Sequence, residues 1–352
     1  MSAGGGSASG GKKIRVGING FGRIGKTAFK IAFDSKRVDV VGINDLSGAR
    51  VSAETLRFDS NYGAYKHNVG FTEKEIVVAG KKIPVFKETE PNRLPWGKLK
   101  VDVVLECTGR FTDSEKAAAH LKAGAKRVVI SAPAKDEGVT PTFLLGVNTG
   151  SYKGEKIVSN ASCTTNCIAP VAQVLNDAFG IEKMMMTTVH SVTAEQNLVD
   201  GNPPGLKGGD LRRARSAIGN IVPTSTGAAI STAKAIPALE GKFDSISLRV
   251  PTRVGSLSDF TILLKKDVTI EQVNKAFVSA EKTRQYRGIL QTTTDPLVSS
   301  DIIGNPHSAI VDLSLTNVVG GNMVKVIAWY DNEWGYSNRL VEIALEISSR
   351  ST

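Results

Sequence analysis

The sequence predicts an α/β protein in two parts: a parallel sheet flanked by helices, then an α+β part with an antiparallel sheet. Short, continuous Val and Ile runs alternate with helical segments up to about Ser162, which is typical of parallel strands covered on both faces. From Met184 onward the apolar runs are longer and partly alternate with polar residues, as antiparallel strands do. A chain of 352 residues, 41% hydrophobic and 22% charged, is long enough for two globular domains.

The first part is expected to follow a short tail. Residues 1–11 are almost all Gly, Ser and Ala and cannot bury enough surface to fold, so they are predicted to be flexible. Val- and Ile-rich runs then predict strands, and amphipathic stretches between them predict helices. The strands are expected at 14–18, 38–44, 101–107, 127–131 and 156–159, and the helices at 22–34 and 114–123.

The second part is expected to mix longer strands with helices. The strands are predicted at 184–189, 245–250, 256–266 and 325–330, and the helices at 168–175, 225–235, 270–279 and 335–348. Between them lies a Gly-, Pro- and Arg-rich segment, 200–215, that is too long for a simple connection. Loops of this length are usually functional or disordered.

The composition excludes several classes of protein. No apolar run approaches the roughly 18 residues of a membrane span, and no signal segment opens the chain, so a soluble cytoplasmic protein is expected. The three cysteines, Cys107, Cys163 and Cys167, are an odd number that fits a reducing compartment without disulfides. No second Cys or His pair at ligand spacing accompanies them, so no metal site is expected.

The charge of the chain favours anionic partners. A net charge of +10 suits phosphorylated metabolites or nucleotides, or a nucleic acid bound without specificity. The densest basic run, 211–215, has no aromatic residues interleaved with it, and an exposed basic loop is an equally good interpretation. Nucleic-acid binding is therefore expected to be secondary at most.

A glycine motif predicts a dinucleotide-binding domain of the Rossmann type. Gly20-Phe21-Gly22-Arg23-Ile24-Gly25 follows a predicted strand and opens a helix, and a second strand ends at Asp45, twenty residues after Gly25. The glycines allow a tight turn close to a pyrophosphate, the helix N-terminus favours its charge, and the carboxylate binds a ribose. Asp45 beside Leu46 favours NAD over NADP, and dual use stays open. An ordinary tight turn and a helix cap are the alternative.

A cysteine at the start of a helix is the candidate nucleophile. Cys163 follows a predicted strand and is surrounded by residues that cap helices, including Ser162 and Thr164. The helix N-terminus and a nearby imidazolium would lower the thiol pKa, and His190 ends the strand that begins at Met184. Together they would form a nucleophile and base pair. A small buried cysteine without a chemical role is the alternative.

With these motifs in order, the chain resembles the phosphorylating glyceraldehyde-3-phosphate dehydrogenases over about residues 13–347. The most specific matching blocks are 19–25, 159–167, His190 with Thr193, 226–229, 249–252 and 329–338. The resemblance implies NAD as cofactor, D-glyceraldehyde 3-phosphate and inorganic phosphate as substrates, and a homotetramer. The implied reaction forms 1,3-bisphosphoglycerate through a hemithioacetal and a thioester on the cysteine.

The resemblance also implies a role for each matching residue. Cys163 would attack the aldehyde, and His190 would accept the proton. Thr193 and Arg249 would bind the substrate phosphate, and the residues implied for inorganic phosphate are Ser162, Thr164, Arg213, Thr226 and Gly227. Those implied for the cofactor are Asn19, Gly20, Phe21, Gly22, Arg23, Ile24, Asp45, Thr108, Gly109, Phe111, Ser131, Asn332 and Tyr336.

The expected domains are an NAD-binding domain at 12–162, a catalytic domain at 163–331, and a C-terminal helix, 332–352, that returns to the first domain. The chain departs from the family at Thr89-Glu90-Pro91, where the family has Arg-Asp-Pro, and in the segment 200–215, which looks longer than usual. Three alternatives stay open: an erythrose-4-phosphate dehydrogenase, a semialdehyde dehydrogenase, or a nucleic-acid or surface-binding protein without catalysis.

Overall fold

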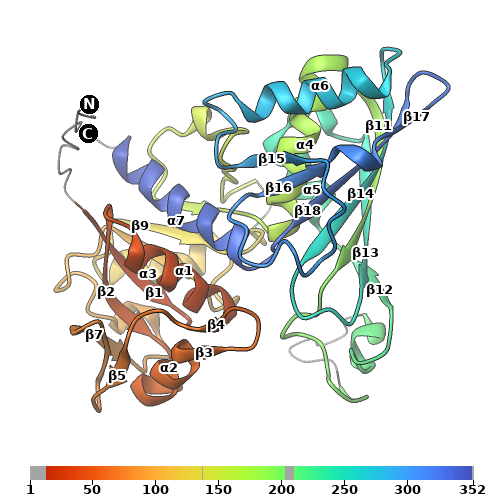
Figure 1. Cartoon of the computed structure of the whole chain (residues 1–352). Coiled ribbons are helices and arrows are strands. Elements are labelled where there is room, and N and C mark those ends of the chain that lie inside the picture. The colour runs from red at the N-terminus through yellow and green to blue at the C-terminus, as the bar shows by residue number, and fades with distance from the viewer. Residues whose placement is uncertain (1–12, 137, 203–209, 351–352) are drawn as a thin grey trace, which may run out of the picture.

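The computed structural model describes residues 13–136, 138–202 and 210–350. The chain forms two eight-stranded sheets, one from each half of the sequence (Figure 1). The expectation for the tail at 1–11, and part of the expectation for the segment 200–215, lie outside the described residues. Within the described ranges, no helix is both long and apolar enough to cross a membrane.

The first sheet has the strand order β10-β9-β8-β1-β2-β7-β6-β5. Its first six strands pair in parallel, and β6 and β5 extend one edge in antiparallel fashion. This confirms the predicted Rossmann-like parallel sheet. The strands are β1 (Ile14–Asn19), β2 (Val38–Asn44), β5 (Val69–Phe71), β6 (Glu75–Val78), β7 (Lys81–Phe86), β8 (Val103–Glu106), β9 (Arg127–Ile130) and β10 (Ile157–Ser159).

Helices cover both faces of this sheet, as the Val and Ile runs predicted. Side chains from α1, α2 and α7 pack on one face against Val16, Ile18 and Leu105. The buried Trp96 and side chains of α3 pack on the other. The elements of this half are α1 (Arg23–Asp34), α2 (Gly48–Arg57), β3 (Phe58–Asp59), β4 (Gly63–Ala64), η1 (Pro91–Arg93), α3 (Ser114–Lys122) and η2 (Thr149–Ser151), with α7 (Trp334–Ser349) returning from the C-terminus.

The second sheet has the order β12-β13-β11-β14-β18-β16-β15, with β17 paired to β18. Side chains of α4, α5 and α6 pack against one of its faces and form the core of this half. Its strands are β11 (Ile181–His190), β12 (Val222–Ser225), β13 (Phe243–Arg249), β14 (Ser256–Leu264), β15 (Leu290–Thr293), β16 (Ala309–Asp312), β17 (Asn317–Val319) and β18 (Met323–Tyr330). Its helices are α4 (Cys163–Phe179), η3 (Leu211–Ala214), α5 (Ala228–Ala235), η4 (Pro237–Leu239), α6 (Ile270–Glu281) and η5 (Leu313–Leu315).

The predicted second sheet with antiparallel strands is confirmed, and two of its strand pairs are parallel, which the sequence did not predict. The central pairs β11–β14 and β14–β18 are antiparallel, but β11–β13 and β15–β16 are parallel. A parallel pair needs a long crossover, and the chain between β11 and β13 supplies one that contains β12 and α5. Alternation along a strand reports that one face is buried, which is typical of antiparallel sheets but does not give the direction of each neighbouring strand.

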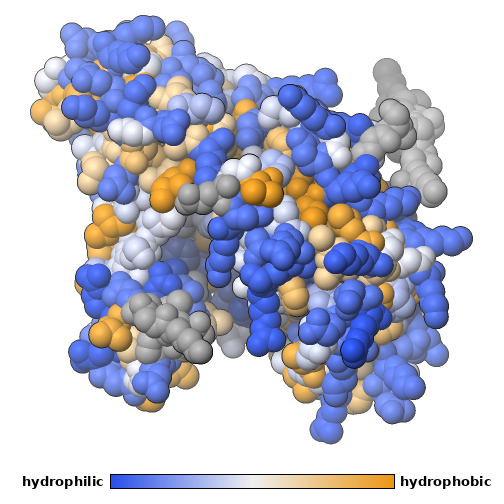
Figure 2. Space-filling model, turned by 180° about the vertical axis from the view of Figure 1, so that it is seen from behind, coloured by the Kyte–Doolittle hydropathy of each residue, from blue (hydrophilic) through white to orange (hydrophobic). Residues whose placement is uncertain are grey.

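The last helix joins the two halves, and Figure 1 shows α7 lying between the two sheets. Its buried residues Leu340, Val341 and Ile343 belong to the same core cluster as Val16 and Ile18 of β1. Just before α7, Glu333 forms an ion pair with Arg23 at the start of α1, and Arg23 also pairs with Asp59 at 2.7 Å. Seen from behind, the molecule is hollowed between two lobes whose surfaces are largely hydrophilic (Figure 2).

The turn from β1 into α1 depends on two glycines. Gly20 has φ +90°, and a Cβ there would lie 2.8 Å from the backbone of Cys107 and Thr108. A Cβ on Gly25 would lie 2.0 Å from the carbonyl oxygen of Gly20. Gly22, between them, faces open space and a Cβ there would meet nothing within 4 Å. Close packing therefore requires glycine at two of the three positions.

We expect Gly25→Ala to lower the free energy of unfolding by about 3 kcal/mol, since the added methyl group meets backbone that cannot move aside cheaply. Gly22→Ala is the matched control and should stay within about 0.5 kcal/mol of the unsubstituted protein. Denaturant unfolding followed by circular dichroism would measure both. Equal effects of the two substitutions would contradict the packing argument.

Candidate active site

A cavity of about 500 Å³ lies between the two halves of the molecule. It is lined by residues of α1, the loop after β9, the start of α4, the end of β11, β13 and the segment before α7. All the residues predicted for catalysis and for phosphate binding line it, together with five of those predicted for the cofactor. These residues are Arg23, Ile24, Ser131, Ser162, Cys163, Thr164, His190, Thr193, Arg213, Thr226, Gly227, Arg249, Asn332 and Tyr336.

Cys163 is the first residue of α4, and its position is fixed by the turn before it. Ala161 adopts φ +52°, a conformation that is unfavourable for a residue with a Cβ and is concentrated at functional sites. Its carbonyl oxygen accepts a hydrogen bond from Tyr336 Oη at 2.9 Å, and its N–H donates to Ser159 Oγ at 3.0 Å. Ser162 then caps the helix, because its Oγ accepts from the N–H of Thr165. The sequence predicted the cap and gave no sign of the strained turn.

The structure brings Cys163 and His190 together across 27 residues of sequence. Cys163 Sγ lies 3.5 Å from His190 Nε2. His190 is buried, and its Nδ1 lies 2.7 Å from the carbonyl oxygen of Ser191 and 2.6 Å from Arg249 Nη1. With a proton on Nδ1 donated to Ser191, Nε2 is free to accept the thiol proton.

Burial and the charge of Arg249 lower the pKa of His190 to about 3, so its imidazole is neutral at neutral pH. Burial raises the pKa of the Cys163 thiol, although Arg249 and hydrogen bonds to Thr164 act in the opposite direction. The prediction that the thiol pKa is lowered by an imidazolium is therefore wrong for this structure. The resting pair is a neutral thiol facing a neutral imidazole, which is the arrangement of a nucleophile with its general base.

Two arginines and a glutamate form an ion-pair cluster at the edge of the cavity. Arg213 Nη1 and Arg249 Nη2 lie 3.1 and 3.3 Å from the same oxygen, Glu195 Oε1. Arg213 Nε also donates to Thr224 Oγ1 at 2.7 Å. Sequence reasoning missed Glu195, although an acidic residue two positions after Thr193 was a visible signal.

Several donors at this edge have no protein partner. Thr193 Oγ1 and Arg249 Nε are buried and make no hydrogen bond within the described residues. Buried polar groups without partners are costly and often mark a place where a ligand binds. A hydroxyl and a guanidinium N–H can both donate a hydrogen bond. The missing partner of each is therefore an acceptor, such as a phosphate oxygen.

Four of the five residues predicted for inorganic phosphate lie at two helix starts, and the fifth, Arg213, lies in η3. Ser162 and Thr164 flank Cys163, and Thr164 Oγ1 lies 3.0 Å from the buried Tyr330 Oη. Thr226 and Gly227 directly precede α5. The hydroxyls of Ser162 and Thr164 are thus held in place by hydrogen bonds within the protein.

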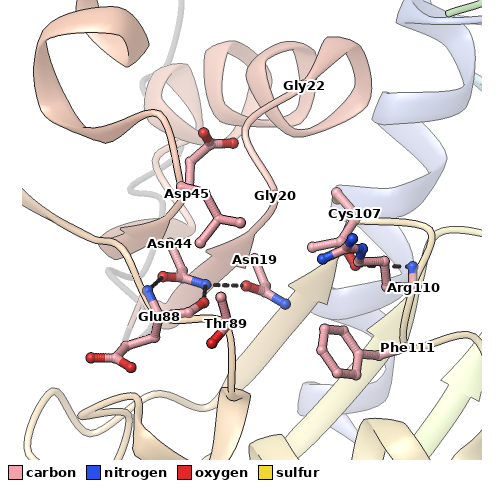
Figure 3. Close-up of a pocket in the computed structure, with 12 residues that line it drawn as sticks. Asn19, Gly20, Gly22, Asn44, Asp45, Glu88, Thr89, Cys107, Arg110 and Phe111 are labelled. Atoms are coloured by element: carbon pink, nitrogen blue, oxygen red, sulfur yellow. Dashed lines mark hydrogen bonds between the residues drawn. The ribbon is translucent and has the colours of Figure 1, made fainter.

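A second cavity of about 300 Å³ lies at the carboxyl ends of β1, β2 and β8, where ligands bind in sheets of this kind. Figure 3 shows Asn19 and Asn44 at its floor, joined by a hydrogen bond of 2.7 Å. The residues predicted for the cofactor that line it are Asn19, Gly20, Gly22, Asp45, Thr108 and Phe111. Thr89, which stands at the departure from the family, lines it too, and so does Arg110, which the sequence analysis did not name.

The glycine turn beside this cavity fits a dinucleotide. The N-cap of α1 is Gly22, with no side-chain hydrogen bond to the first turn of the helix. Free N–H groups and open space at a helix start suit the close approach of a pyrophosphate. Asp45 Oδ2 accepts from the N–H of Phe21 at 2.8 Å, so this carboxylate also braces the turn.

Two predicted cofactor residues line neither cavity. The ring of Phe21 is buried in the core of the first half, 5.5 Å from Phe29 in an edge-to-face contact. Gly109 has φ +69° and lies in the loop after β8. The ring of Phe21 is therefore taken up by the core and its N–H by Asp45, and its role in cofactor binding stays a prediction.

A buried hydrogen-bond network that the sequence did not reveal supports the floor of the second cavity. Glu106, with no exposed side-chain surface, accepts from Asn19 Nδ2 at 2.5 Å, from the N–H of Thr108 at 2.8 Å and from His120 Nε2 at 2.9 Å. Trp96 Nε1 donates to His120 Nδ1 at 3.0 Å, which leaves the imidazole proton on Nε2. This carboxylate therefore fixes two residues that line the cavity.

No group of three or more potential metal ligands occurs among the residues that the structure describes.

Asn332, at the junction of the two halves, uses its Oδ1 to accept from Ser191 Oγ, the N–H of Gly255 and Ser256 Oγ at 2.9–3.1 Å. Within the described residues its amide NH₂ makes no hydrogen bond, so this group is available to a ligand. Asn332 can therefore act toward the cavity only as a donor.

Comparison with known proteins agrees with this geometry. The model of the glyceraldehyde 3-phosphate dehydrogenase NAD-binding domain matches residues 14–114, and that of the C-terminal domain of the same enzyme matches residues 162–332. The chain is 47% identical over 340 residues to glyceraldehyde-3-phosphate dehydrogenase of Streptomyces coelicolor, which covers 96% of this chain and 99% of the relative.

Other relatives are equally similar. The enzyme of the same name from Geobacillus stearothermophilus is 47% identical over 339 residues, or 96% of this chain and 99% of the relative. That of Mycobacterium avium is 49% identical over 338 residues, or 94% of this chain and 97% of the relative. The parallel sheet with its glycine turn is thus an NAD-binding domain, and NAD is the cofactor. The chain belongs to the glyceraldehyde-3-phosphate dehydrogenase family.

Proposed function

We propose that this protein oxidises D-glyceraldehyde 3-phosphate with NAD and inorganic phosphate to 1,3-bisphosphoglycerate. The observation that carries the proposal is the 3.5 Å approach of Cys163 Sγ to His190 Nε2 at the start of α4. It occurs in one cavity with two arginines and two unpartnered buried donors, which suits a substrate that carries a phosphate.

In the first step Cys163 Sγ attacks the aldehyde carbon. The S–C bond forms as the thiol proton passes to His190 Nε2, and the electron pair of the carbonyl moves onto its oxygen. The N–H of Cys163 at the helix start and the protonated imidazole are the donors for that oxygen. The imidazolium then gives its proton to that oxygen, which leaves a hemithioacetal and a neutral imidazole. The neutral state of both groups supports this sequence, because each is in the protonation state that the step requires.

The second step is oxidation of the hemithioacetal to a thioester. NAD, when bound, supplies the acceptor for the hydride. In our proposal the amide NH₂ of Asn332 would donate to the carboxamide of a bound nicotinamide, and Tyr336 would pack beside the ring. His190 accepts the hydroxyl proton of the hemithioacetal as its C–H bond breaks. The saturated Oδ1 of Asn332 supports its role as a fixed donor.

In the last step inorganic phosphate attacks the thioester carbon. The S–C bond breaks, the acyl phosphate leaves, and the thiolate takes the proton that His190 accepted in the second step. We assign Thr193 and Arg249 to the phosphate of the substrate, and the assignment for inorganic phosphate is Ser162, Thr164, Arg213, Thr226 and Gly227. The unpartnered Thr193 Oγ1 and Arg249 Nε support the first assignment.

At the other end of the cofactor, we propose that the remaining predicted residues bind the adenosine and pyrophosphate. Gly20, Gly22 and the uncapped start of α1 support the pyrophosphate site. Asp45 supports a preference for NAD, because its carboxylate would repel a 2′-phosphate. Arg110 lines the same cavity, so discrimination depends on the balance between the two charges.

We further propose the domain division 12–162, 163–331 and 332–352, a homotetramer, and a cytoplasmic location. Exposed apolar side chains support assembly: Met185 and Ile246 are 58% and 42% exposed on neighbouring strands of the second sheet. Their face is opposite to the one covered by α4 and α6. The three cysteines are all unpaired, which supports a reducing compartment.

The reaction is tested by mixing the protein with D-glyceraldehyde 3-phosphate and NAD and following NADH absorbance with and without inorganic phosphate. We expect steady turnover only with phosphate or arsenate, because the thioester otherwise keeps the cysteine occupied. Turnover limited by water alone would contradict the proposal. Little rate with triose phosphate, but a high rate with a semialdehyde, would move the assignment to that substrate.

Cys163→Ser should reduce dehydrogenation at least about a thousandfold, because the hydroxyl is a far weaker nucleophile than the thiol. NAD affinity should stay close to that of the unsubstituted protein. Cys167→Ala, one helical turn further along α4 and outside the cavity lining, is the matched control and should keep its activity. Retained activity in Cys163→Ser would remove this residue from the mechanism.

Arg249→Ala should raise the KM for D-glyceraldehyde 3-phosphate about ten- to a hundredfold, the effect of losing about 1.5–3 kcal/mol from a charged hydrogen bond. Arg212→Ala is the control, since Arg212 pairs with Asp210 at the surface and does not line the cavity. Steady-state kinetics with each variant measures the difference. An unchanged KM and rate in Arg249→Ala would mean that the substrate phosphate binds elsewhere.

A further inference from the structure

Glu195 is the one residue of the ion-pair cluster with Arg213 and Arg249 that has no role in the proposed reaction. Its Oε1 lies 3.1 Å from Arg213 Nη1 and 3.3 Å from Arg249 Nη2, so a single carboxylate bridges two guanidinium groups. The other contacts of these arginines in the described chain are to neutral groups, the imidazole of His190 among them. Glu195 is therefore the anionic partner of both.

We propose that Glu195 is a built-in counter-ion that competes with phosphate for Arg213 and Arg249. The inference rests on the proposed function, in which Arg249 binds the phosphate of the substrate and Arg213 binds inorganic phosphate. A carboxylate and a phosphate offer the same kind of acceptor to a guanidinium. Each phosphate must consequently displace Glu195 or bind beside a negative charge.

The burial of the three side chains supports displacement. The side chains of Arg213 and Arg249 are 16% and 12% exposed, whereas that of Glu195 is 43% exposed. Arg213 is also held by Thr224 Oγ1, and Arg249 by the carbonyl oxygen of Ser191. The arginines are thus fixed from behind, and the carboxylate is the member of the cluster that can turn toward solvent.

The backbone around Glu195 forms a local turn that places the carboxylate beside the two arginines. The N–H of Thr193 donates to Gln196 Oε1 at 3.1 Å, and the N–H of Gln196 donates to the carbonyl oxygen of Thr193 at 3.0 Å. The turn therefore carries both Thr193, which lines the cavity, and Glu195, which pairs with two arginines that line it. Competition by Glu195 would weaken phosphate binding and speed release of the doubly phosphorylated product.

The test is the Glu195→Gln substitution in the full-length, NAD-loaded protein. Titration calorimetry with inorganic phosphate should show a dissociation constant three- to tenfold lower than in the unsubstituted protein. The KM values for phosphate and D-glyceraldehyde 3-phosphate should fall by a similar factor, with kcat unchanged or lower. A gain in affinity is informative because damage to the fold would produce a loss.

Glu54→Gln is the matched control. Glu54 is 45% exposed and pairs with Arg57 on α2, away from both cavities, so its substitution removes the same charge without changing phosphate affinity. A phosphate dissociation constant in Glu195→Gln that stays within twofold, or rises, would overturn the inference. Thermal melting of both variants verifies that each is folded.

The binding measurement separates this inference from the proposed reaction. Calorimetry with phosphate needs no turnover, so tighter binding would support the competition even if D-glyceraldehyde 3-phosphate proved not to be a substrate. Conversely, phosphate-dependent NADH formation with unchanged phosphate affinity would uphold the reaction and reject the role of Glu195.

Discussion

The hydrogen bond from Tyr336 to the carbonyl oxygen of Ala161 is the constraint on which the rest of the site depends. It ties the last helix to the strained turn that presents Cys163, and that helix is itself packed into the core of the first half. The strain at Ala161 is stabilised from both sides, by Tyr336 and by Ser159 at the end of β10. The turn that presents the thiol is consequently held by a helix whose Tyr336 lies 175 residues away in sequence.

Sheet topology determines the second part of the site. His190 ends β11, and its register partner on the parallel strand β13 is Arg249. Because the two strands are parallel, both residues lie at the carboxyl end of their strands. The general base His190 therefore lies beside Arg249, the cation that lowers its pKa. If β13 were antiparallel to β11, Arg249 would lie at the opposite end of β11, away from His190. The parallel pairing of β11 with β13, which the sequence analysis did not predict, thus brings these two residues together.

Local chemistry made much of the site predictable. The glycine turn, Asp45, the capped cysteine and His190 were found because each has a short sequence pattern with a physical reason. What could not be predicted depends on contacts distant in sequence: the neutral thiol reflects burial, Phe21 is taken up by the core, and Glu195 meets two arginines that lie 18 and 54 residues away. The Glu106–His120 network likewise joins elements that no local pattern links.

The placement of α7 has a consequence for how the protein is made. Leu340, Val341 and Ile343 complete the core that begins with Val16 and Ile18, so the first domain emerging from the ribosome lacks part of its own interior. Domains usually fold as units in the order of their synthesis. Here the core of the N-terminal domain is complete only after the final helix has been synthesised. A nascent chain stalled before that helix would expose apolar surface to chaperones and proteases.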